Sequence, residues 1–138
     1  MSRVINPDSI GKERTKLTKS VVLALRELMR QSEPDQNSRD LAAYIALALA
    51  EIYATVDVSV VAWEKRGYWV KADRFRMDWE WTQFTAQKMS DAVKKEDWPA
   101  IAMVAVQVGQ KMMNVDVPAR HRLGTPWVGA WKKLIETH

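Results

Sequence analysis

The sequence contains no cysteine, which excludes disulfide bonds, thiolate zinc sites and a cysteine nucleophile. Only two histidines are present: His138 is the last residue, and His121 lies in a basic segment with no acid–base partner spaced near it. The Glu-x-x-His pairs of di-iron bundles, phosphate-binding glycine loops and nucleophile elbows are missing too. We therefore predict that the protein is not an enzyme and that it uses no metal and no cofactor.

The N-terminal stretch MSRVINPDSIGKERTK lacks the apolar core of a signal peptide. Residues 41–63 are long enough to cross a bilayer, but Glu51 and Asp57 interrupt them, and the uninterrupted apolar run covers only residues 41–50. A membrane span and a buried central helix are the two interpretations, and the two acids favour the buried helix. We predict a cytoplasmic protein that does not enter a membrane.

At 138 residues, of which 47% are hydrophobic and 28% charged, the chain is large enough to build one sizeable core. No internal repeat, low-complexity tract or break in composition divides it, so we predict a single domain, residues 1–138. Apolar residues recur at spacings of three and four through most of the chain. This pattern is typical of helices that each turn one face toward a common core.

Capping signals indicate where the first two helices begin and end. The stretch INPD, residues 5–8, has the character of a helix start, and the apolar stripe that follows it ends near residue 31. Asn37, with Asp40 three residues further on, resembles a capping pair for a second helix. Gly67 is suited to the left-handed position that ends this helix.

The stretch RFRMDWEWT, residues 74–82, alternates polar and apolar side chains, which is the pattern of a β-strand. Two observations favour a helix instead. Arg74 with Asp78, and Arg76 with Glu80, have the spacing of helical ion pairs. The apolar stripe that begins here also continues well past the alternating stretch. We predict a third helix, with a small β-hairpin as the alternative.

Asp97-Trp98-Pro99 has the character of the cap and first turn of a fourth helix. Thr125-Pro126 repeats this signal ahead of a short terminal helix. The connections between the main helices are short, which favours antiparallel neighbours. The predicted fold class is therefore all-α: an up-down four-helix bundle with a short C-terminal fifth helix.

The net charge of +4 is unevenly placed, because both ends of the chain are basic. Residues 1–31 hold seven basic and three acidic side chains, and residues 98–138 hold five and two. A solvated surface and an anion-binding face are both compatible with this excess. The residues that we predict to contact nucleic acid are Lys12, Lys16, Lys19, Arg120, Arg122, Lys132 and Lys133.

Seven tryptophans are many for a chain of this length, and we expect Trp63, Trp79 and Trp131 to pack in the core. The stretch YWVK, residues 68–71, also has the composition of a surface that stacks the bases of single-stranded nucleic acid. The third helix carries a second apolar strip that one core does not easily cover, which indicates a contact with a subunit or partner. The predicted protein-interface residues are Met77, Trp81, Phe84 and Trp127; docking of the terminal helix on the bundle is the other role open to Trp127.

Glu51 and Asp57 stand on the most apolar helix, about 240° apart around its axis, so they do not form one site. We expect each to pair with a cation of a neighbouring helix; a role in an enzyme or small-ligand site is the alternative. The function that the sequence favours is non-catalytic binding by a basic subunit that contacts nucleic acid non-specifically, within a homo-oligomer or a larger complex. The alternative is a protein–protein interaction module with no nucleic-acid role.

Overall fold

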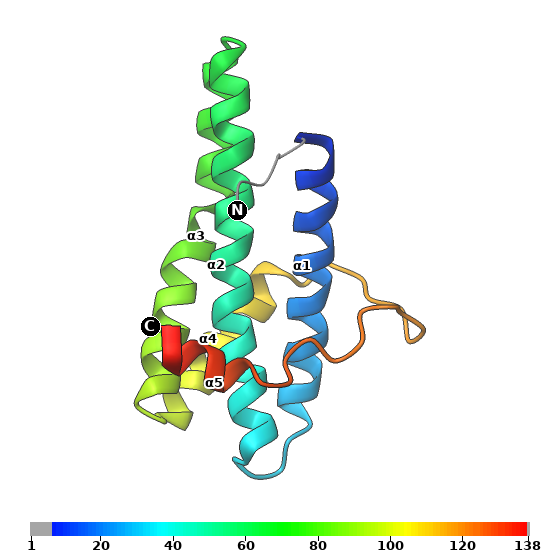
Figure 1. The fold of residues 1–138 in the computed structure, drawn as a ribbon, viewed down its shortest axis with the longest axis vertical. Helices are drawn as coiled ribbons and strands as arrows, with labels where there is room; N and C mark the ends of the chain where they lie inside the picture. The colour runs from blue at the N-terminus through cyan, green and yellow to red at the C-terminus, as the bar shows by residue number, and fades with distance from the viewer. Residues whose placement is uncertain (1–6, 138) are drawn as a thin grey trace.

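A computed structural model describes the backbone of residues 7–137 and the side chains of residues 9–136 (Figure 1). Residues 7–137 form five α-helices and no strand. The helices are α1 (Pro7–Met29), α2 (Gln36–Lys65), α3 (Trp69–Lys94), α4 (Trp98–Lys111) and α5 (Ala130–Thr137). The predicted all-α class is confirmed, and so is the helical interpretation of residues 74–82, which lie inside α3.

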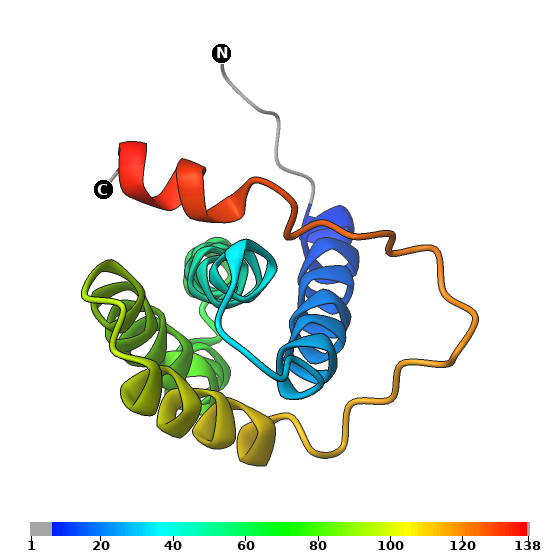
Figure 2. The same cartoon turned by 90° about the horizontal axis from the view of Figure 1, so that it is seen from below.

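Helix α2 is the central element, because α1, α3 and α5 all pack against it (Figure 2). Its N-terminal half is enclosed, and Leu41, Ile45, Leu49 and Ile52 are fully buried there. By length and composition alone α2 could cross a membrane, and half of its most apolar stretch is buried inside the protein. The central position of α2 agrees with the prediction, and its burial is greatest in its N-terminal half.

The packing order follows an up-down bundle only in part. Consecutive helices contact each other from α1 to α4, but α4 packs mainly on α3 and touches α1 at few points. Helix α5 lies across the N-terminal part of α2 (Figure 1). Residues 112–129, which we call the strap, join α4 to α5 and pass round the side of α1 that faces away from α2 (Figure 2).

The buried carboxylate of Asp40, 8% exposed, fixes α5 on α2. Its Oδ2 accepts a hydrogen bond from the backbone N–H of Gly129 at 3.2 Å, and its Oδ1 accepts one from the N–H of Trp131 at 3.0 Å. These donors lie at the N-terminus of α5, where backbone N–H groups lack partners within the helix and a negative charge is favoured. Asp40 on α2 therefore caps a helix about 90 residues away in the sequence.

This role of Asp40 corrects the predicted start of α2. The cap is Asp35, whose carboxylate accepts the backbone N–H of Ser38 at 2.8 Å. The predicted capping pair of Asn37 and Asp40 is therefore wrong, since both residues lie inside the helix. The error has a physical cause: an acid near the start of its own helix can instead accept hydrogen bonds from the N-terminus of a distant helix once the chain has folded.

The other helix ends differ in how well they match their signals. Pro7 opens α1 and Asp97 caps α4 as predicted, while the proposed contribution of Ile5 and Asn6 lies outside the described residues. Gly67 has a φ of +79° and follows the end of α2, as expected. Helix α5 begins only at Ala130, later than the Thr125-Pro126 signal indicates, because residues 126–129 form a turn that ends on Gly129 with a φ of +82°.

The ion pairs of α3 also differ from those that spacing predicted. Arg76 pairs with Asp73 at 3.2 Å and with Glu64 of α2 at 3.7 Å. The pairs of Arg76 with Glu80 and of Arg74 with Asp78 are not among the ion pairs that residues 9–136 form. The contact of Arg76 with Glu64 links α3 to α2, and residue spacing within one helix does not predict such a pair.

Candidate nucleic-acid interface

Helix α1 carries three of the predicted nucleic-acid contacts on one outward side. Lys12, Lys16 and Lys19 are all exposed, and their spacing of four and three residues places them on one helix face. Arg14 points the other way, toward α2. The three lysines therefore face away from the bundle, on what we call the outer face of α1.

The strap covers the continuation of this face. Arg26 lies seven residues beyond Lys19, and its Nη1 donates a hydrogen bond to the carbonyl oxygen of Val117 at 2.8 Å. Val117 is buried, so the strap is anchored against α1 at this point. Arg120 and Arg122 follow shortly after it and are exposed. The outer face and the strap thus bring five of the seven predicted cations to one side of the molecule.

The other two predicted cations lie elsewhere. Helix α5 extends away from α1 over α2 (Figure 2), so its exposed Lys132 and Lys133 stand apart from the strap arginines. The Nζ of Lys132 lies 3.9 Å from the Oε1 of Glu136 on the same helix. The seven residues that the sequence groups together are therefore divided into a set of five and a separate pair.

The predicted protein-interface residues are divided as well. Met77 is 73% exposed and Phe84 is 58% exposed, seven residues apart on one face of α3. Trp81 is half-buried and packs against the main core. Trp127 is 6% exposed and belongs to that core, so it has little surface to offer a partner and instead packs the start of α5 onto the bundle.

The carboxylates of α2 are a clear correction. Glu51 and Asp57 are both exposed, and neither is among the ion pairs formed by residues 9–136, so the expected buried pairing with cations is wrong. Helix α5 lies across the N-terminal part of α2 (Figure 1), and further along α2 the side that carries Glu51, Ala54 and Asp57 is exposed. The two acids of this apolar helix therefore stay solvated, because they lie on its exposed side.

Arg14 joins the N-terminal half of α1 to the hairpin of α2 and α3. Its guanidinium donates to Thr55 Oγ1 and to the Thr55 carbonyl, both at 3.0 Å, and to Ser59 Oγ at 2.6 Å. It also lies 4.8 Å from the ring centre of Phe75, a cation–π distance. Burial lowers the pKa of Arg14 from its usual value, and these contacts replace part of the lost hydration.

The end of this hairpin presents residues that the predicted site left out. Residues 65–71, which we call the hairpin tip, project beyond α1 (Figure 1) and expose Tyr68, Trp69 and Val70. The available signal was a run of three large apolar residues directly after a left-handed glycine. A turn that only reverses the chain is usually polar, so such a run at a turn indicates a contact surface.

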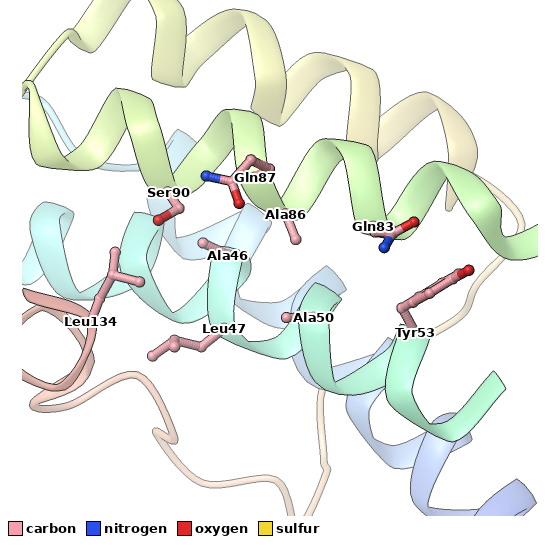
Figure 3. A pocket seen from close by; sticks show the side chains of 9 residues that line it. All are labelled: Ala46, Leu47, Ala50, Tyr53, Gln83, Ala86, Gln87, Ser90 and Leu134. Atoms are coloured by element: carbon pink, nitrogen blue, oxygen red, sulfur yellow. The ribbon is translucent and has the colours of Figure 1, made fainter. Parts of the chain in front are cut away.

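A small groove lined by residues of α2, α3 and α5 lies beside the core (Figure 3). Its volume is about 280 Å³, and Tyr53, Gln83, Gln87 and Ser90 supply its polar groups. Gln87 donates its amide N–H to Asp91 at 3.0 Å. The residues that line the groove include no charged side chain and no histidine. In the part of the chain that the structure describes, no three acids or histidines come together as metal ligands.

Comparison of the chain with models of protein families, with curated proteins and with solved structures finds no match.

Proposed function

We propose that this protein is a non-catalytic, basic binding subunit of the cytoplasm that contacts nucleic acid through the outer face of α1 and the strap. One observation carries the proposal. Lys12, Lys16 and Lys19 share an exposed face, and Arg26 of the same helix holds the strap that adds two more arginines to that side. Exposed cations aligned along a helix suit a phosphate backbone, whose recognition is electrostatic and independent of sequence.

In this proposal residues 1–138 act as one domain, and α1 to α4 serve as an up-down bundle that displays the basic side. Helix α5 supports the arrangement, since Asp40 ties it to α2 and the strap must then pass outside α1 to reach it. Lys132 and Lys133 belong to a second, smaller contact. Binding needs no cofactor and no membrane.

Size-exclusion chromatography with light scattering tests the proposal on protein produced in cells and purified at low salt. We expect nucleic acid to co-purify with the protein, seen as absorbance at 260 nm and as mass above that of the protein alone. Both should be lost at high salt, because phosphate contacts release counterions and so weaken as the salt concentration rises. Protein that elutes free of nucleic acid at low salt, and does not bind added nucleic acid there, would contradict the proposal.

A protein–protein interaction module is the second candidate, and exposed apolar residues favour it. Met77 and Phe84 on α3, and Met103 and Val106 on α4, are all large and exposed. Apolar side chains in such number on neighbouring helices mark a contact with a second copy or another subunit. The two candidates use different sides of the bundle, so a subunit of a nucleic-acid-binding complex could use both.

A further inference from the structure

The hairpin tip carries an aromatic surface that is not covered by packing among the described side chains, residues 9–136. Trp69 is 60% exposed, and Tyr68 and Val70 beside it are exposed as well. The tip stands clear of α1 at the end of the longest helical pair in the protein (Figure 1). Three consecutive large apolar side chains are thus held in water at a projecting end, which costs solvation free energy unless a ligand covers them.

The backbone of the tip is held in a defined turn. Gly67 takes the left-handed conformation, and its N–H donates to the carbonyl of Glu64 at 3.0 Å. The N–H of Tyr68 donates to the carbonyl of Trp63 at 2.9 Å, and the Tyr68 carbonyl accepts the N–H of Ala72 at 3.0 Å. The turn is therefore satisfied by its own hydrogen bonds, so little ordering is needed when a ligand binds.

A second small core stiffens the hairpin below the tip. The ring of Phe75 meets that of Trp63 edge-on, with centres 4.8 Å apart, and Trp79 packs beside it. Val56, Val60 and Ala72 are buried in the same cluster, which is separate from the main core. The exposed aromatic residues therefore stand at the end of a helical hairpin that has its own small core.

Cations surround the exposed rings. Lys65 and Arg66 are exposed at the end of α2, and the Nζ of Lys71 lies 4.5 Å from the ring centre of Trp63. The nearest acids, Glu64 and Asp73, are both paired with Arg76. The tip thus combines flat apolar faces with positive charge, which complements a ligand that has flat rings and negative charge.

We propose that the hairpin tip binds single-stranded nucleic acid, whose unpaired bases stack on Trp69 and Tyr68 while Lys65, Arg66 and Lys71 contact its phosphates. The inference rests on the proposed function and narrows it, because a duplex keeps its base faces covered and gives the rings nothing to stack on. Arg14 anchors the N-terminal half of α1 against the base of the hairpin, so Lys12 and the tip lie toward one end of the molecule. One strand can then run from the outer face of α1 to the tip.

Fluorescence anisotropy with labelled oligo(dT) and with a duplex of equal length tests this on the whole protein. We expect the single strand to bind more tightly than the duplex and Trp69→Ala to weaken single-strand binding at least about fivefold, the effect of losing one stacked base. Trp69→Phe keeps a ring and should retain most of the affinity. Met103→Ala removes an exposed apolar residue of α4, outside the outer face of α1, the strap and the tip, and should bind as the unchanged protein does.

Three outcomes would overturn the inference, and the experiments distinguish them. If single-strand binding is salt-dependent but unaffected by Trp69→Ala, or if the duplex binds equally well, the stacking surface is wrong and the proposed function stands. If neither nucleic acid binds at low salt, both are wrong. If the protein binds anionic phospholipid vesicles but not oligo(dT), and Trp69→Ala abolishes that binding, the tip contacts a membrane surface instead.

Discussion

Removal of the Asp40 carboxylate should destabilise the protein far more than removal of an exposed acid from the same helix. Asp40 is buried and accepts two backbone N–H groups at the start of α5, at 3.2 and 3.0 Å. In Asp40→Ala both donors lose their partner, and α5 loses the negative charge at its N-terminus. In Asp40→Asn one carbonyl oxygen remains, but the amide NH₂ then faces one of the two donors.

The magnitude follows from these two bonds. A hydrogen bond to a charged group contributes about 1.5 to 3 kcal/mol. Water can reach part of the start of α5, so we take the lower end for each bond and expect Asp40→Ala to cost about 3 kcal/mol. Asp40→Asn should cost about half of that, because one acceptor survives. Asp57 is exposed on the same helix, and Asp57→Ala should change stability by less than about 0.5 kcal/mol.

Urea denaturation followed by tryptophan fluorescence measures these differences, and amide hydrogen exchange at Trp131 reports whether α5 opens first. The expected order of stability is the unchanged protein and Asp57→Ala, then Asp40→Asn, then Asp40→Ala. The reasoning is refuted if Asp40→Ala unfolds at the same urea concentration as Asp57→Ala and the Trp131 amide keeps its protection.

Three further predictions concern other parts of the fold. The backbone N–H of Ser38 and, to a smaller extent, its hydroxyl lower the pKa of Asp35 by donating hydrogen bonds to its carboxylate, so the cap stabilises α2 at neutral pH. Asp35→Ala should therefore melt at a lower temperature than the unchanged protein at neutral pH, and the difference should vanish as pH falls below about 4 and Asp35 becomes protonated. Thermal melts of both proteins at several pH values measure this difference. Phe75→Ala should cost about 2 to 3 kcal/mol and speed amide exchange in the hairpin tip, while the amides around Met89 in the main core stay protected; equal loss of protection in both places would argue against a separate cluster. If α3 is a subunit contact, Met77→Glu combined with Phe84→Glu should lower the mass measured by light scattering, and an unchanged mass would remove that role.

The sequence predicted the helices well because their signals are local. The apolar stripes of α1 to α4, the Pro7 and Asp97 starts and the Gly67 stop all lie within a few residues of the feature that they specify. The alternation in residues 74–82 is the one place where two local patterns competed. There the helix prevails because the apolar stripe continues along α3, which packs on α2.

Features that join distant segments were not predictable in the same way. Nothing near Asp40 shows that its partners are Gly129 and Trp131, and nothing near Arg26 shows that it holds Val117. The grouping of the predicted cations depends on these contacts, because they decide where the strap runs. Composition identifies the basic residues as candidates for nucleic-acid binding, but only the path of the chain separates those on α1 and the strap from those on α5.

The salt dependence of oligonucleotide binding tests the central claim most directly. Each lysine that contacts a phosphate adds about 0.7 to the slope of log affinity against log salt for a single strand. Replacing Lys12, Lys16 and Lys19 together by Gln should therefore lower the slope by about 2. A control with the same charge change, Lys88, Lys95 and Lys111 replaced by Gln, removes exposed lysines of α3, the turn after it and α4, and should leave the slope unchanged. Equal slopes for the two triple variants would contradict the assignment of nucleic-acid binding to the outer face of α1.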